Sequence, residues 1–101
     1  MDDNKSRREN LTPMLLVSIE IYKLKLENKN ATYDEIKKRL PNIKVMDALN
    51  KCMDLGSVMP EWFRINGEQW DAKYYLYGSE TENFIHRLCI DLGEIEVKVV
   101  K

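Results

Sequence analysis

Few residues of this 101-residue chain have the types and spacing that catalysis or metal binding requires. His86 and Cys89 form an HxxC pair, but a tetrahedral zinc site needs four ligands and no CxxC motif accompanies the pair. The single histidine has no serine or cysteine nucleophile in a recognisable motif, and the four glycines form no phosphate-binding loop. We therefore expect no enzyme activity, no metal and no cofactor.

Basic residues are concentrated in one part of the chain. The whole sequence carries 16 Lys and Arg against 17 Asp and Glu, a net charge of −1. Residues 23–51 carry eight basic against four acidic residues, or +4, whereas residues 1–22 sum to −1 and residues 52–101 to −4. A local positive excess can attract the phosphates of a nucleic acid. The alternative is a lysine-rich helix face that only interacts with water.

Two short helical patterns occupy this basic segment, one on each side of Pro41. In the first, Thr32 and Glu35 have the spacing of a capping box, and Pro41 ends the run because it disfavours helical geometry in the residue before it. In the second, apolar residues recur every three or four positions over residues 43–55, and Gly56 supplies the left-handed residue that ends a helix. The pattern predicts a helix-turn-helix.

The segment ahead of this pair, residues 11–27, also has helical spacing. Thr12 is a suitable N-cap and Pro13 falls at the first helical position. Residues 17–26 alternate between apolar and polar as a strand would, so periodicity alone leaves both structures open. The Thr-Pro start and the length of the segment favour a helix.

The next segment is rich in aromatic residues and predicts a β-hairpin over residues 61–77. Asn66-Gly67 is a strong turn sequence, because a type I′ turn needs positive φ at both central residues. We expect the far end of the hairpin to project into solvent. The predicted register pairs Ile65 with Glu68, Phe63 with Trp70 and Glu61 with Ala72 on one face, and Trp62 with Asp71 and Arg64 with Gln69 on the other.

After Gly78 the sequence predicts a helix over residues 81–90 and an alternating strand over residues 94–101. Such a strand needs a partner, either the hairpin or the same strand of a second chain. Cys52 and Cys89 are far apart and lie in apolar helical patterns, so we expect buried free thiols, as in a cytoplasmic protein. The length suits one domain, residues 1–101, and no apolar run is long enough for a membrane span.

The order helix, helix, helix, hairpin, helix resembles a winged helix-turn-helix domain of small archaeal and bacterial transcriptional regulators. The resemblance covers residues 11–78 and rests on four stretches. They are TYDEIKKRL at 32–40, Ala48-Leu49, Leu55-Gly56-Ser57-Val58, and Tyr74-Tyr75-Leu76-Tyr77. It implies an α+β fold, a three-helix bundle with a hairpin wing. Residues 1–10 would then be a flexible arm carrying Arg7 and Arg8, and residues 79–101 an added helix and strand.

The resemblance also implies a function, DNA binding in transcription regulation by a homodimer, with helix 43–55 in the major groove and hairpin 61–77 as the wing. Lys44 would meet a phosphate or a guanine edge and Asn50 an adenine, while Asp47 and Asp54 depart from this role because a carboxylate repels phosphate. These two acids leave a second interpretation open, a winged helix that binds a protein partner or serves in assembly without DNA. The DNA-binding residues that the resemblance implies are Lys37, Lys38, Lys44, Asn50, Lys51, Arg64 and Gln69.

Overall fold

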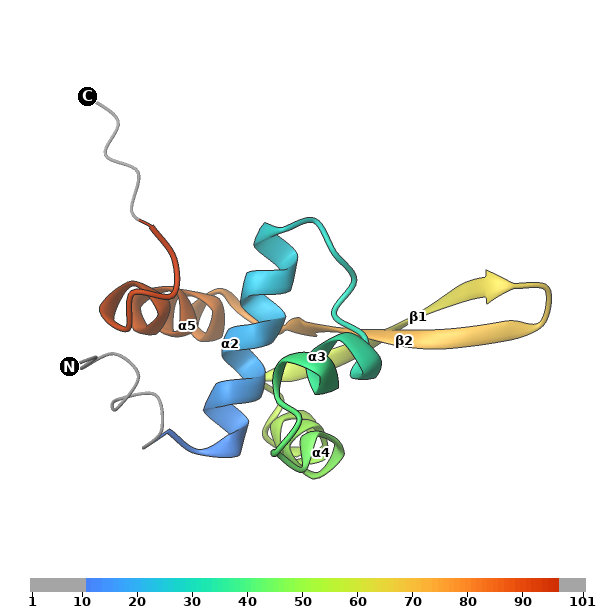
Figure 1. Cartoon of the computed structure of the whole chain (residues 1–101), viewed down its shortest axis with the longest axis horizontal. Helices are drawn as coiled ribbons and strands as arrows, with labels where there is room; N and C mark the ends of the chain where they lie inside the picture. Colours follow the sequence, from blue (N-terminus) through green and yellow to red (C-terminus); the bar gives the residue numbers. More distant parts are fainter. Residues whose placement is uncertain (1–10, 97–101) are drawn as a thin grey trace.

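The computed structural model describes residues 11–96, and these residues form four helices and one antiparallel hairpin, an α+β arrangement (Figure 1). The predicted N-terminal arm, with Arg7 and Arg8, and residues 97–101 of the predicted strand lie outside the described residues. In chain order the elements are α2 (Pro13–Leu26), α3 (Tyr33–Arg39), α4 (Val45–Leu55), β1 (Val58–Asn66), β2 (Gln69–Leu76) and α5 (Ser79–Asp91).

Helix α2 is the central element of the fold. Thr12 caps it by accepting a hydrogen bond from the amide of Leu15, and Pro13 occupies its first turn, as predicted. The helix contacts α3, α4, α5 and β2, so nearly all of its residues from Leu16 to Leu24 are buried. The alternating pattern that suggested a strand is therefore that of a helix covered on several sides, and the helical prediction is confirmed.

Helices α3 and α4 form the predicted pair. Thr32 caps α3 by accepting from the amide of Glu35, but its own amide donates to the carbonyl of Asn30, so only half of the expected capping box forms. Helix α4 begins at Val45, two residues later than predicted, and ends at Leu55, followed by the left-handed C-cap residue Gly56 with φ of 77°. The local sequence thus places the helix ends correctly to within about two residues.

The register of the hairpin differs from the prediction by one residue. Arg64 lies opposite Trp70, and Trp62 opposite Ala72. The predicted type I′ turn centred on Asn66-Gly67 is wrong: the loop is Gly67-Glu68, and only Gly67 has positive φ. A one-residue shift moves the side chains of one strand to the other face relative to those of its partner strand, so Trp62, Arg64 and Trp70 share a face. The remaining pairs are Val58–Leu76, Met59–Tyr75, Pro60–Tyr74, Glu61–Lys73, Phe63–Asp71 and Asn66–Gln69, with Ile65 bulged.

The base of the hairpin is fixed by the helices, whereas its far end is not. Val58 and Leu76, an opposed pair, are buried in the core, and the amide of Tyr74 donates to the carbonyl of Ala31. The far end of the hairpin extends alone, away from the helices (Figure 1), and most of residues 61–71 are exposed. We call residues 61–71 the hairpin tip and the rest of the described chain the body.

The chain does not form the predicted strand where it leaves α5. The amides of Gly93 and Glu94 donate to the carbonyls of Ile90 and Cys89, the hydrogen bonds of a Schellman motif. These bonds hold the chain in a turn, so the strand predicted from Glu94 onwards is wrong over residues 94–96. No helix within residues 11–96 is both long enough and apolar enough to cross a membrane.

Candidate nucleic-acid interface

The outward face of α4 carries polar side chains that the fold does not use for packing. Its opposite face is buried in the core through Val45, Ala48, Leu49 and Cys52. Successive residues of an α-helix are about 100° apart, so the side opposite this buried stripe is centred on three exposed positions. These central residues are Asp47, Asn50 and Asp54.

The two lysines of α4 lie at one edge of this outward face. Lys44 is the N-cap residue and Lys51 lies seven positions later, and both are exposed. With Asp47 they line a groove of about 530 Å³ between α4 and the start of α2, where Pro13 and Met14 form part of the other wall. The structure therefore groups Lys44 and Lys51, but it places a carboxylate between them.

The two lysines predicted as phosphate contacts on α3 have different environments. The Nζ atom of Lys37 donates to the carbonyl of Ile43 at 2.7 Å, so Lys37 holds the turn between α3 and α4. Ile43 lies two residues before the start of α4, which makes Lys37 a positioning residue for the helix. Lys38 is exposed, with Nζ 3.5 Å from a carboxylate oxygen of Glu35.

Arg39 is a basic residue whose contacts are with acidic residues of the body. Its guanidinium donates to both carboxylate oxygens of Glu27, at 2.8 and 2.9 Å, and lies 3.6 Å from the buried carboxylate of Glu20. The hydrogen bonds from Arg39 lower the pKa of Glu27 to about 2. Sequence spacing could not reveal this, because Glu27 and Arg39 are brought together by the turn between α2 and α3.

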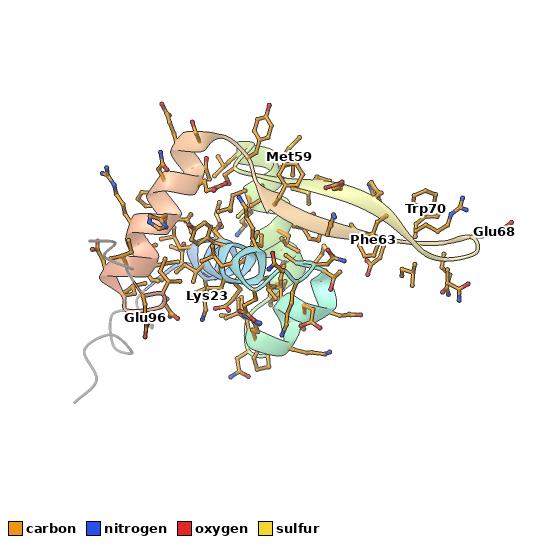
Figure 2. The ribbon with its side chains drawn as sticks, turned by 90° about the horizontal axis from the view of Figure 1, so that it is seen from above. Lys23, Met59, Phe63, Glu68, Trp70 and Glu96 are labelled. Carbon is orange, nitrogen blue, oxygen red and sulfur yellow. The ribbon has the colours of Figure 1, made fainter. Side chains whose placement is uncertain are left out.

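Arg64 and Gln69 lie in the hairpin tip, close to the turn. The guanidinium carbon of Arg64 is 5.2 Å from the centre of the Trp70 ring, a cation–π contact. Trp62 and Trp70 are 64% and 55% exposed. Figure 2 shows Trp70 at the far end of the hairpin, away from the helices. Arg64 and Gln69 therefore form a second group, on a different element from Lys44 and Lys51.

The sequence did not predict the aromatic surface around Arg64. The predicted register put Trp62 and Trp70 on opposite faces, whereas the structure places both on one face with Arg64 between them. Three acids, Glu61, Glu68 and Asp71, give residues 61–71 a net charge of −2. The hairpin tip is thus aromatic and mildly acidic, with one arginine on its aromatic face.

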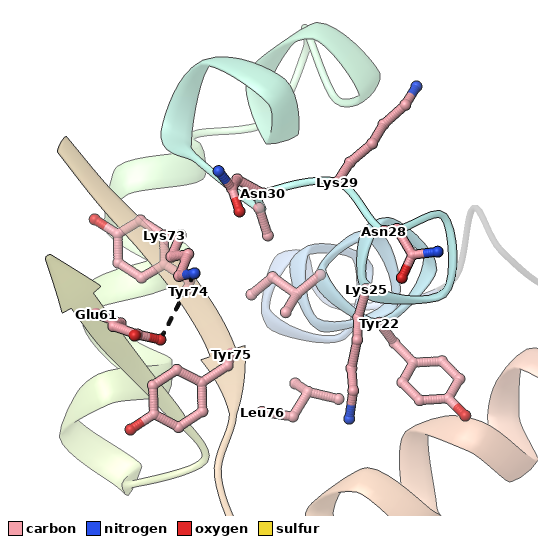
Figure 3. A pocket seen from close by; sticks show the side chains of 12 residues that line it. Tyr22, Lys25, Asn28, Lys29, Asn30, Glu61, Lys73, Tyr74, Tyr75 and Leu76 are labelled. Carbon is pink, nitrogen blue, oxygen red and sulfur yellow. Dashed lines mark ion pairs between the residues drawn. The ribbon is translucent and has the colours of Figure 1, made fainter. Parts of the chain in front are cut away.

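A second concave site of about 320 Å³ lies between the end of α2 and the hairpin (Figure 3). Tyr22, Lys25, Lys73 and Tyr74 line it. Its lysines are paired with acids: Lys73 Nζ lies 3.9 Å from Glu61 and Lys25 Nζ 2.9 Å from the carboxylate of Glu82. Because these positive charges are neutralised locally, this pocket is less suited to an anion than its lysine content suggests.

His86 and Cys89, the HxxC pair, have the surroundings of residues that pack helices together. The Nδ1 atom of His86 is hydrogen-bonded to the hydroxyl of Tyr22 at 2.6 Å, which joins α5 to α2. Cys52 and Cys89 are buried free thiols, as predicted, and burial raises the pKa of the Cys52 thiol. Among residues 11–96, no group of three or more His, Cys, Asp or Glu side chains could hold a metal ion.

No protein-family model matches this chain, and searches of the curated proteins and of the solved structures found no match.

Proposed function

We propose that this protein is a winged helix-turn-helix protein that binds duplex DNA as a transcriptional regulator, with α4 in the major groove and the hairpin as the wing. The observation that carries the proposal is the outward face of α4. It presents Lys44, Asn50 and Lys51 to solvent on a helix whose other face is fixed in the core. Such a helix can enter a groove without any change in the body.

Each exposed side chain of this face has a chemical role in the proposal. Lys44 and Lys51 neutralise phosphates at one wall of the groove, and the Asn50 amide pairs with an adenine edge. Asp47 and Asp54 repel phosphate, so they must face the base edges, where the amino group of cytosine is the partner that suits a carboxylate. Sites with cytosine beneath α4 should therefore be preferred.

The other predicted contacts have secondary roles. Lys38, which is exposed on α3, would meet phosphate beside the groove, and Lys37 would act indirectly by holding the turn ahead of α4. Arg64 and Gln69 on the wing meet the backbone next to the groove. The net charge of −2 of residues 61–71 is unfavourable for a contact with phosphate. Most of the affinity for DNA should therefore come from α4.

Retention on mixed-sequence duplex DNA across a salt series tests the proposal. We expect retention to weaken steeply as salt rises, with a slope that falls by about one for each phosphate-contacting lysine replaced. The double variant Lys44→Glu, Lys51→Glu should abolish retention and leave the circular dichroism spectrum unchanged. An absence of retention at low salt, or indifference to the double variant, would exclude DNA binding through α4.

Lys29→Glu is the matched control for the single variants Lys44→Glu and Lys51→Glu. It makes the same charge change at an exposed lysine in the loop between α2 and α3, away from α4. We expect Lys29→Glu to retain most of the affinity. An equal loss in all three single variants would show that bulk charge, and not the face of α4, determines binding.

The same titration can show whether the wing takes part. Trp62 and Trp70 are the only tryptophans of the chain and both lie in the hairpin, so tryptophan fluorescence reports on the wing alone. We expect DNA that binds α4 and the wing together to quench or shift this fluorescence. Salt-sensitive DNA binding without any change in fluorescence would restrict the interface to α4.

The exposed tryptophans favour a second candidate function, a winged helix that binds a protein partner or serves in assembly. Trp and Arg are among the residues most enriched at the positions that dominate protein–protein binding energy, and Trp62, Arg64 and Trp70 share one face of the hairpin. The acidic residues at the centre of α4 suit this function as well. It becomes the better proposal if DNA is not retained at low salt.

A further inference from the structure

The two tryptophans of the hairpin tip lie on one face, at successive cross-strand pairs. Trp62 pairs with Ala72, and the next pair on this face joins Arg64 to Trp70. Residues on one face of a strand are two positions apart, so the two pairs are separated by about 7 Å along the hairpin. Both tryptophans are more than half exposed, and no ring-to-ring contact among the described residues involves either indole. The face therefore presents two separate aromatic surfaces to solvent.

The acidic residues of the tip are kept away from this aromatic face. Glu61 and Asp71 alternate with the tryptophans along the two strands, so they lie on the opposite face, and Glu68 is in the loop. Arg64 is the one charged residue of the tip on the aromatic face, where its guanidinium carbon lies 5.2 Å from the centre of the Trp70 ring. The aromatic face is thus locally positive, although residues 61–71 sum to −2.

We propose that this face binds unpaired nucleotides of a single-stranded nucleic acid, with one base stacked on Trp62 and a neighbouring base on Trp70. Such stacking accepts any base, because every base has a π-face. The guanidinium of Arg64 supplies a positive charge for the phosphate that joins the two nucleotides. The tip is then a second nucleic-acid contact, chemically different from the lysines of α4.

Unpaired nucleotides fit this face better than a duplex because of spacing and charge. Bases in a duplex are stacked about 3.4 Å apart and cover one another, whereas the two indoles are on pairs about 7 Å apart. Only a strand whose bases are separated can place one base on each ring. The net charge of residues 61–71 disfavours a high density of phosphates, so stacking must supply most of the affinity. Binding should therefore depend only weakly on salt.

Quenching of tryptophan fluorescence tests this contact, since Trp62 and Trp70 are the only tryptophans of the chain. The titration uses the full chain at a salt concentration at which duplex DNA is not retained. We expect oligothymidylate and oligouridylate to quench the fluorescence, and binding of either one supports the proposal. An abasic oligodeoxynucleotide of the same length, or oligothymidylate paired with its complement, should have little effect. No quenching by either single strand, or equal quenching by the abasic strand, would overturn the proposal and favour a protein as the partner of this face.

Substitutions at exposed aromatic positions locate the contact. Trp62→Ala should raise the Kd for oligothymidylate about tenfold, the loss expected for one stacked base, whereas Trp62→Phe should retain most of the affinity because it keeps a ring. Phe84→Ala is the matched control, since it removes an exposed aromatic side chain from α5, outside the tip. Its Kd should be unchanged, and circular dichroism checks that all three variants fold. Equal Kd values for Trp62→Ala and the unmodified protein would overturn the proposal.

This contact does not rest on duplex binding by α4, and one variant separates the two. The double variant Lys44→Glu, Lys51→Glu changes α4 alone, so it should bind oligothymidylate like the unmodified protein. A chain that binds oligothymidylate but retains no duplex would support the contact at the tip and exclude DNA binding through α4. A chain that retains duplex through α4 but is not quenched by oligothymidylate or oligouridylate would overturn the contact at the tip alone.

Discussion

Helix α2 and the hairpin tip are both rich in apolar residues, but only α2 is covered. Eight residues of α2 are buried against the elements around it. In the tip, Trp62, Ile65 and Trp70 are each more than half exposed. The apolar residues of α2 are explained by the stability of the body, whereas those of the tip are not. A surface that the fold itself does not need is where we expect a contact with another molecule.

The largest expected effect compares two isoleucines, one in each region. Ile19 in α2 is 0% exposed and Ile65 in the tip is 55% exposed. We expect Ile19→Ala to lower the free energy of unfolding by about 3 kcal/mol through lost burial and a new cavity. Ile65→Ala should change it by less than about 0.5 kcal/mol. Urea unfolding followed by circular dichroism measures both, and comparable losses would show that the tip is packed against something in the free protein.

An intermediate effect compares two glycines with positive φ. An added Cβ at Gly56 (φ +77°) or Gly67 (φ +52°) meets nothing within 4 Å, so Ala at either position introduces backbone strain alone, about 1 kcal/mol. At Gly56 we expect this loss in global unfolding. At Gly67 we expect faster hydrogen exchange of tip amides with a smaller change in global stability, because the tip can open by itself. Equal global losses would mean that the tip and body unfold together.

The smallest expected effect comes from a comparison of two ion pairs, one in the body and one on the hairpin. Arg39 lowers the pKa of Glu27 from 4.5 to about 2, so the folded state binds fewer protons than the unfolded state as pH falls. This contribution to stability is present above pH 4.5 and disappears as the pH falls towards 2. The stability difference between the unmodified protein and Glu27→Gln should therefore shrink over this range.

Glu61→Gln is the counterpart on the hairpin, where the Glu61 carboxylate lies 3.9 Å from Lys73. We expect almost no stability difference from this change at any pH, since an isolated exposed pair contributes little. Chemical unfolding at a series of pH values distinguishes the two variants. A Glu27→Gln difference that persists at pH 2 would contradict the role given to Arg39.

Much of the fold could be predicted because the helix ends are encoded within a few residues. Thr12 and Thr32 cap their helices through the next turn, and Gly56 ends α4 with the left-handed φ that the sequence indicated. The hairpin register could not be read in the same way. Asn66-Gly67 and Gly67-Glu68 are both acceptable two-residue loops, and the choice depends on burying Val58 opposite Leu76 at the far end of the strands.

The candidate site was only partly predictable. The exposure of Lys44, Asn50 and Lys51 follows from the helical period of α4, which the sequence shows. The hydrogen bond from Lys37 to the carbonyl of Ile43 does not follow from the helical period, because it depends on the turn between α3 and α4.

The sequence by itself determined where the helices begin and end and which face of α4 is apolar, since capping, proline and helical period act over a few residues. Only the tertiary structure decided which charged side chains remain available to contact another molecule, and which aromatic residues share a face. Arg39 is held by Glu20 and Glu27, and Trp62 joins Trp70 on one side of the hairpin. These outcomes depend on strand register and helix packing, which bring together residues that are distant in the chain or shift them by one position.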